Sequence, residues 1–226
     1  MAAVERALAA LSASFADEID CFGLDQKVLL LAERGGRHAP AFKAYYRPVQ
    51  EPVLVSSWGK LTGLSFDGEQ AAEVASLLVG SRQRIRTKSM VGQALDGSVF
   101  VFAKRPAQYW TDEIQFEAAK THGAIKLAAK LFQIVIYEHP FTDGNGRFSR
   151  AMIYSALARF GLIRNPCLGL NGVFELHRES MALAFRQSHI HGSPEPMMEA
   201  ITTLLEDSVG LVRALLQRPY TNSVEV

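Results

Sequence analysis

The chain has 226 residues, of which 48% are hydrophobic and 21% charged, as in an ordinary globular protein. Lys plus Arg number 24 and Asp plus Glu number 23, so the formal net charge is +1. This balance excludes a charge-rich disordered chain and gives no overall attraction to nucleic acid or to an anionic membrane. No stretch reaches the ~20 apolar residues that a membrane span needs. We expect one large domain, or one domain with an extension, that binds no membrane, and any binding of nucleic acid would have to be local.

The N-terminus and the cysteines indicate a cytoplasmic protein. Glu5 and Arg6 interrupt the first residues, and acidic side chains follow over 17–20, so the segment does not resemble an export signal. Cys21 and Cys167 lie far apart, with no metal-ligand spacing around them. We expect two buried thiols in a reducing compartment, because free cysteine packs as a small hydrophobe.

The first helices and a charged row occupy the N-terminal third. Residues 4–16 form an amphipathic pattern, and a helix start follows at Asp67, where Gln70 can complete a capping box. This second helix is expected to end near Gly80. Basic residues then alternate with other types over 82–88, which indicates one solvated face of a strand. A patch that contacts a target or a nucleic acid is the alternative for this row.

A β-hairpin is predicted over residues 85–105. Asp96-Gly97 is a strong hairpin turn pair, residues 98–102 are rich in strand formers, and Met90-Val91 supplies the partner strand.

Helices are predicted for most of the rest of the chain. Residues 127–137 are apolar on nearly every side, which is typical of a central buried helix. A helix over 146–160 is expected to stop at Gly161, and further helices are expected over 173–188 and 197–217.

The segment that carries chemistry is His139–Arg150, with the sequence HPFTDGNGRFSR. Residues 144–146 form a flexible turn that leads into a helix, so backbone N–H groups and the helix dipole favour an anion there. Arg147 and Arg150 are three residues apart and share a helix face, which favours a polyphosphate.

Two further side chains flank this anion site. Asp143 offers a hard oxygen ligand, which suits Mg²⁺ on a nucleotide. His139 precedes the turn, and its ordinary pKa near 6.5 suits a general base for a hydroxyl nucleophile. The segment therefore predicts attack of a hydroxyl on a nucleotide phosphate.

The segment matches every defined position of the motif HPFx[DE]GNGRxxR, and the chain therefore resembles the Fic family. The resemblance implies a mainly α fold, a Fic-type helical bundle around a central buried helix with a small β-hairpin flap. It also implies a catalytic domain over residues 66–226, with its core at about 85–190. Residues 1–65 are then an N-terminal extension of unclear structure.

What the resemblance implies for activity is transfer of AMP from Mg²⁺-ATP to a Ser, Thr or Tyr hydroxyl of a target protein. His139 would be the general base, Asp143 the magnesium ligand, and Phe141 the anchor of the loop. The ATP-binding residues would be Gly144, Asn145 and Gly146 as the anion hole, Arg147 for the β-phosphate and Arg150 for the γ-phosphate. The flap residues that dock a target segment would be Val99, Phe100, Val101 and Phe102.

Three alternatives remain open. One is a catalytically silent or differently specialised Fic-fold binding protein. Another is a phosphotransferase of the kinase-like branch, although those relatives carry a lysine-containing sequence in place of GNGR. The third is a nucleic-acid-binding protein that uses the basic row over 82–88, which a steep salt dependence would reveal.

How the activity is inhibited is a separate open question. The family's inhibitory pattern [ST]xxxE[GN] has its best counterpart at Thr202–Glu206, but Asp207 stands where Gly or Asn is required. We expect Glu206 to be a solvated partner for a nearby Lys or Arg. A separate inhibitory antitoxin-like protein, or no restraint, is at least as consistent with the sequence. His189 and His191 form an HxH pair in a predicted loop and suggest no third metal ligand.

Overall fold

The structure is a computed structural model that describes residues 1–14, 24–37, 58–93 and 99–217. It is mainly helical, with one two-stranded antiparallel sheet in the described part, so the predicted fold class is confirmed. No helix among the described residues is both long and apolar enough to cross a membrane. The helices are Ala2–Ser14 (α1), Leu24–Arg34 (α2), Trp58–Thr62 (α5), Gly68–Val79 (α6), Ala107–Lys120 (α7), Ala124–Glu138 (α8), Asn145–Arg159 (α9), Leu170–Leu176 (α10), Arg178–His191 (α11) and Glu195–Leu216 (α12).

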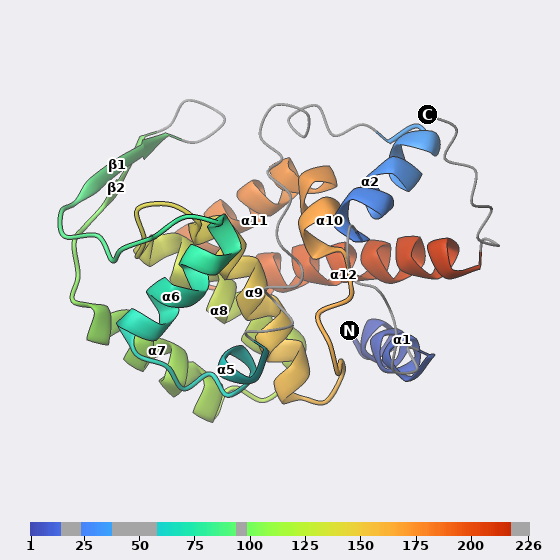
Figure 1. The fold of residues 1–226 in the computed structure, drawn as a ribbon, viewed down its shortest axis with the longest axis horizontal. Helices are drawn as coiled ribbons and strands as arrows, with labels where there is room; N and C mark the ends of the chain where they lie inside the picture. The colour runs from blue at the N-terminus through green and yellow to red at the C-terminus, as the bar shows by residue number, and fades with distance from the viewer. Residues whose placement is uncertain (15–23, 38–57, 94–98, 218–226) are drawn as a thin grey trace.

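The bundle is built around α8 and α9, which pack against each other at its centre (Figure 1). Leu127, Leu131 and Val135 of α8 are fully buried, as the apolar pattern over 127–137 predicts. The other helices surround this pair, with α7 and α12 against α8 and with α5 and α6 against α9. The central pair therefore has neighbours on several sides, and the loop between its helices is held by a rigid core.

The start and end of α6 follow local sequence rules. Asp67 accepts the backbone N–H of Gln70 at 2.8 Å, and the Gln70 side chain accepts the Asp67 N–H at 3.0 Å. Gly80 ends the helix in the left-handed region with φ of 76°. Both predictions for this helix are confirmed.

The N-terminal segments share the core of the bundle. Leu8 of α1 and Val28 of α2 are fully buried in the same cluster as the central helices, and both helices pack against α12. The boundary proposed at residue 65 stays a prediction. Cys167 is also buried in this core, but it is disulfide-bonded, so the prediction of a free thiol is wrong for it. Cys21 lies outside the described residues.

The helix predicted over 173–188 is instead two helices, α10 and α11, that meet at His177. The His177 ring lies 2.6 Å from a carboxylate oxygen of Asp207 on α12, and Arg37 beyond the end of α2 bonds the same oxygen. These contacts between segments far apart in sequence hold the junction of α10 and α11 at His177. Local periodicity in the sequence cannot reveal them.

The flap is a hairpin of β1 (Met90–Gln93) and β2 (Val99–Phe102), with Met90 opposite Phe102 and Val91 opposite Val101. The predicted turn Asp96-Gly97 lies outside the described residues. The hairpin lies at the left edge of the molecule in Figure 1, on the side away from α1 and α2.

Candidate active site

His139 lies at the junction between α8 and the motif loop. It closes α8 by donating its backbone N–H to the carbonyl of Val135 at 3.0 Å, and it adopts the left-handed conformation with φ of 45°. Pro140 follows, and a proline disfavours the helical conformation in the residue before it. A non-glycine residue in this region is strained, so the surrounding contacts must hold His139 in place.

The loop after His139 is held by one side chain and one aromatic cluster. The Asn145 side chain accepts the Phe141 N–H and donates to the Phe141 carbonyl, both at 2.9 Å. Phe141 is fully buried, with its ring 5.0 Å from that of Phe148 and 5.8 Å from that of Trp110. The structure thus places Phe141 as the anchor the motif suggests, but it uses the Asn145 side chain as a brace rather than an anion contact.

Gly144 and the start of α9 form the turn that was predicted to receive an anion. Gly144 has φ of 84°, and a Cβ atom there would lie 2.5 Å from a methyl carbon of Val79. The first helical N–H groups, of Asn145 and Gly146, lie at the N-terminus of α9, where no intrahelical acceptor exists. Asp143 is exposed at the entrance, and its carboxylate accepts the Gly144 N–H at 2.6 Å.

The two motif arginines occupy different environments on the first turns of α9. Arg147 is partly exposed and reaches the carbonyl of Leu78 at 3.5 Å. Arg150 is buried, and its Nε donates to the side-chain oxygen of Asn171. Burial lowers the pKa of Arg150 to about 10, so it remains charged at neutral pH. Both arginines lie on the first two turns of α9, and their predicted roles as phosphate contacts stay predictions.

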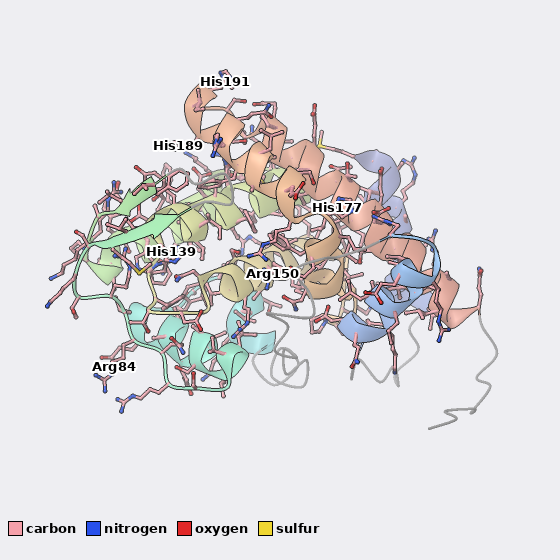
Figure 2. The ribbon with its side chains drawn as sticks, turned by 90° about the horizontal axis from the view of Figure 1, so that it is seen from above. Arg84, His139, Arg150, His177, His189 and His191 are labelled. Carbon is pink, nitrogen blue, oxygen red and sulfur yellow. The ribbon has the colours of Figure 1, made fainter. Side chains whose placement is uncertain are left out.

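Arg86 is a site residue that the sequence did not reveal. Its side chain is buried, so the prediction of a solvated row is wrong for Arg86, although Arg82, Arg84 and Lys88 are exposed. Figure 2 shows Arg84 pointing outward, away from His139 and Arg150. The Arg86 guanidinium donates to five backbone carbonyls, those of Lys88, Phe102, Ala103, Glu138 and His139.

We call the five hydrogen bonds of the Arg86 guanidinium the Arg86 clamp. Backbone hydrogen bonds between the same segments add to it. The Arg86 N–H donates to the Pro140 carbonyl at 2.8 Å, and the Thr142 N–H donates to the Arg84 carbonyl at 3.1 Å. The segment after α6 therefore pairs with the motif loop, and Arg86 joins that loop to the base of the flap, at Lys88 before β1 and at Phe102 and Ala103 at the end of β2. Alternation of charges gives no signal for this, because only the tertiary fold buries one member of the row.

The flap reaches His139 through Phe102. The two rings stack with centroids 4.3 Å apart and an interplanar angle of 21°. The other three predicted docking residues, Val99, Phe100 and Val101, are exposed. The strand therefore presents apolar side chains to solvent near His139, which is compatible with docking of an extended segment.

The environment of His139 lowers its basicity. Burial, and then the positive charge of Arg86, lower the pKa of His139 from 6.5 to about 4, although the Ile136 carbonyl and Asp143 act in the opposite direction. Nδ1 is buried and makes no hydrogen bond of normal geometry. The Ile136 carbonyl acts on the ring as a weak acceptor and raises its pKa. The ring is neutral at neutral pH, with its proton assigned to Nδ1 and its lone pair to Nε2.

Two other candidates lie on the C-terminal helices α11 and α12. Glu206 is exposed on α12 and makes no ion pair within the described residues, whereas Asp207 beside it bonds His177 and Arg37. The HxH pair lies on α11 rather than in a loop, and His189 contacts the Tyr137 ring at 5.1 Å. The described part of the chain contains no group of three residues that could hold a metal ion around this pair.

Comparison with known proteins agrees with the motif. Residues 66–157 match the model of the Fic/DOC family. No curated protein matches the chain.

Solved structures of Fic proteins share its fold. A Fic family protein from Desulfovibrio desulfuricans G20 is 14% identical, with a TM-score of 0.57 over 98% of this chain and 69% of that one. Fic-1 from C. elegans (residues 134–508) is 16% identical, with a TM-score of 0.54 over 94% and 72%. A Fic domain containing signaling protein from Bacteroides thetaiotaomicron VPI-5482 is 16% identical, with a TM-score of 0.51 over 94% of each chain. Residues 66–157 are therefore similar to the Fic/DOC family, and the chain shares the fold of these Fic structures.

Proposed function

We propose that this protein transfers AMP from Mg²⁺-ATP to a hydroxyl group of a target protein and releases pyrophosphate. The observation that carries the proposal is the placement of a neutral histidine directly before a helix N-terminus that bears two arginines. A base, an anion-binding turn and fixed cations are the parts needed for attack on a nucleotide phosphate. A Fic-type transferase is the coarser statement that the family match and the fold support.

We assign each chemical role to one residue. Nε2 of His139 takes the proton from the target hydroxyl, because Nδ1 is buried beside the Ile136 carbonyl. The hydroxyl oxygen bonds to the α-phosphorus while the bond to the bridging oxygen of the β-phosphate breaks. The N–H groups at the start of α9 receive the α-phosphate, and Arg147 and Arg150 hold the leaving pyrophosphate.

Magnesium fits the site through one carboxylate. Asp143 is exposed at the entrance and one of its oxygens is engaged by Gly144, so the other is available to a cation. A single carboxylate suits Mg²⁺ on a nucleotide, because the ion takes its remaining oxygens from phosphates and water. When bound, the ion would neutralise part of the polyphosphate charge.

The flap is the surface we assign to the target. Val99 and Val101 are exposed on β2, and main-chain pairing with an edge strand can fix the register of an extended segment. The target is then a protein that presents a Ser, Thr or Tyr hydroxyl in an extended loop. Glu206, the candidate internal inhibitor, is exposed to solvent on α12. We therefore assign inhibition of the activity to a separate antitoxin-like protein.

The decisive experiment uses two labels on ATP. The protein is incubated with Mg²⁺, a cell lysate and ATP labelled at the α- or at the γ-phosphate, and the labelled proteins are separated. AMP transfer labels targets from the α-position only, with release of pyrophosphate. Label from the γ-position would assign the protein to the kinase-like branch instead.

His139→Ala is the matched control. It should abolish labelling while nucleotide binding persists, because the imidazole moves a proton and does not hold phosphate; loss of a general base costs about 10²–10⁴ in rate. If the wild type binds Mg²⁺-ATP but labels no target in any lysate, the silent-binder alternative replaces the proposal. Undiminished labelling by the variant would exclude His139 as the base.

A further inference from the structure

Hydrogen bonds through Asn171 connect Arg150 to a side chain of the N-terminal helix α2. Nε of Arg150 is bonded to Oδ1 of Asn171 at the start of α10, and its guanidinium carbon lies 4.7 Å from the centre of the Phe174 ring. Within the described residues, the two terminal nitrogens of Arg150 have no hydrogen-bond partner, so they are available to an anion. Within the described residues, only one edge of the buried guanidinium is thus held by a hydrogen bond.

Asn171 is itself oriented by Asp25. A carboxylate oxygen of Asp25 accepts the side-chain Nδ2–H of Asn171 at 3.0 Å, and the other accepts the backbone N–H groups of Asn171 and Gly172 at 3.0 and 3.1 Å. A carboxylate can only accept hydrogen bonds here. The NH₂ end of the Asn171 amide must therefore face Asp25, and its oxygen must face Arg150.

Close packing holds Asp25 in position. Asp25 and Asn171 are both buried, and a Cβ atom at Gly172 would lie 2.3 Å from the backbone oxygen of Asp25. One turn further along α2, Val28 is fully buried and lies 2.9 Å from where a Cβ atom would stand at Gly169. The backbones of α2 and α10 therefore touch, and the relay of hydrogen bonds has little room to rearrange.

Asp25 and Arg150 also interact electrostatically. Arg150 is a buried cation, and Asp25 and Glu175 are the anionic side chains whose fields favour its charged form. Asp25 is also the accepting end of the hydrogen-bonded chain that ends on Arg150; burial raises the pKa of its carboxyl, and the hydrogen bonds of Asn171 and Gly172 and the charge of Arg150 act in the opposite direction. A buried charge is tolerated when it is hydrogen-bonded and balanced in this way.

We propose that Asp25 is a positioning residue of the polyphosphate site, which fixes the polarity of Asn171 and through it the direction of Arg150. This inference rests on the proposed function, because it takes Arg150 as a phosphate contact. It gives the N-terminal segment a role in nucleotide binding that the motif does not contain.

Asp25→Asn is the test, because it preserves shape and reverses the polarity of one atom. The new NH₂ group must face either the two backbone N–H groups or Nδ2 of Asn171. In the second case Asn171 turns over and presents its own NH₂ group to Nε–H of Arg150. In either case two donors face each other. In the first case the clash falls on the start of α10, which carries Asn171, and in the second case the anchor of Arg150 itself is lost.

The readout is the ratio of affinities for Mg²⁺-ATP and Mg²⁺-ADP, measured by calorimetry on the full chain. Because Arg150 is assigned to the terminal phosphate, Arg150→Ala should remove most of the preference for ATP. Asp25→Asn should lower the ratio about tenfold, which is the scale of one hydrogen bond to a charged group. Asn171→Ala should have the same effect, and the double variant should add little to either.

Val28→Ala is the matched control on the same helix interface. It creates a small cavity between α2 and α10 without touching the relay, so it should lower the thermal midpoint but keep the ATP-to-ADP ratio. Loss of the ratio in Val28→Ala as well would mean that α2 acts only by packing, and the positioning role would be overturned.

The remaining outcomes separate the two proposals. A ratio that falls in Arg150→Ala but not in Asp25→Asn overturns the inference and leaves the proposed function standing. A ratio unchanged in Arg150→Ala, or no binding of Mg²⁺-ATP by the wild type, contradicts the proposed function, and the inference falls with it.

Discussion

The ring of Phe102, at the end of the flap, stacks on the ring of His139, with their centroids 4.3 Å apart. The same flap residue accepts a hydrogen bond from Arg86 through its backbone carbonyl, and Arg86 also bonds the carbonyl of His139. The proposed target-docking strand and the proposed base are therefore joined twice, by ring contact and through one guanidinium. A substitution in the flap should therefore change the environment of His139.

Phe102→Ala should raise the pKa of His139 toward 6.5. The aromatic ring helps to keep water from the imidazole, and burial is the largest cause of the depressed pKa. The measurement is an NMR titration of the ring protons of His139 in the nucleotide-free protein. Val101→Ala is the control, since Val101 is exposed on the neighbouring position of the same strand and should leave the titration unchanged.

His139 should also make the protein less stable in acid. Its pKa is about 4 in the folded state against 6.5 as the ordinary value, so between these pH values the unfolded chain binds more protons. The contribution of His139 to the free energy of unfolding is thus complete above pH 6.5 and decreases as the pH falls towards 4. Urea unfolding at pH 7 and pH 5, compared between the wild type and His139→Gln, measures it. An equal loss in both proteins would contradict the assigned shift.

Arg86→Met should destabilise the protein by about 2–4 kcal/mol, because it leaves buried carbonyls without donors. Transferase activity should fall together with the hold on His139. Arg84→Ala is the control: its side chain is exposed, so the change in unfolding free energy should stay within about 0.5 kcal/mol. Denaturant unfolding measures the free energy of unfolding of the two variants. A similar loss of stability in both would contradict a stabilising role for the Arg86 clamp.

The local parts of this site can be predicted from sequence because they depend on neighbours in the chain. The capping box at Asp67 and the α9 start after Gly144 each involve residues within a few positions. Arg86, Asn171 and Asp25 could not be predicted in this way. Apart from the bond between Arg86 and Lys88, their partners lie 16 to 147 positions away, and a buried arginine has the same alternation as its exposed neighbours. Burial there is decided by tertiary packing and leaves no local periodicity.

The glycine at the start of α9 offers the sharpest test of the anion site. Gly144 has φ of 84°, and an added Cβ atom would lie 2.5 Å from a Val79 methyl carbon and 3.7 Å from the carbonyl oxygen of Ala75. Gly144→Ala must therefore bear both left-handed strain and a clash with α6. Gly161→Ala shares the strain, with φ of 69°, but nothing lies within 4 Å of its Cβ position.

Comparison of the two variants separates backbone strain from displacement of the helix end. Both should lose about 1–2 kcal/mol of stability from the left-handed conformation. Gly144→Ala should lose more, and its affinity for Mg²⁺-ATP should fall about tenfold or further, because relief of the clash moves the N–H groups at the start of α9. Calorimetry and urea unfolding of both proteins provide the two quantities. If Gly144→Ala kept wild-type affinity at a stability equal to that of Gly161→Ala, the turn would not be the phosphate site, and the roles assigned to Arg147 and Arg150 would lose their geometric basis.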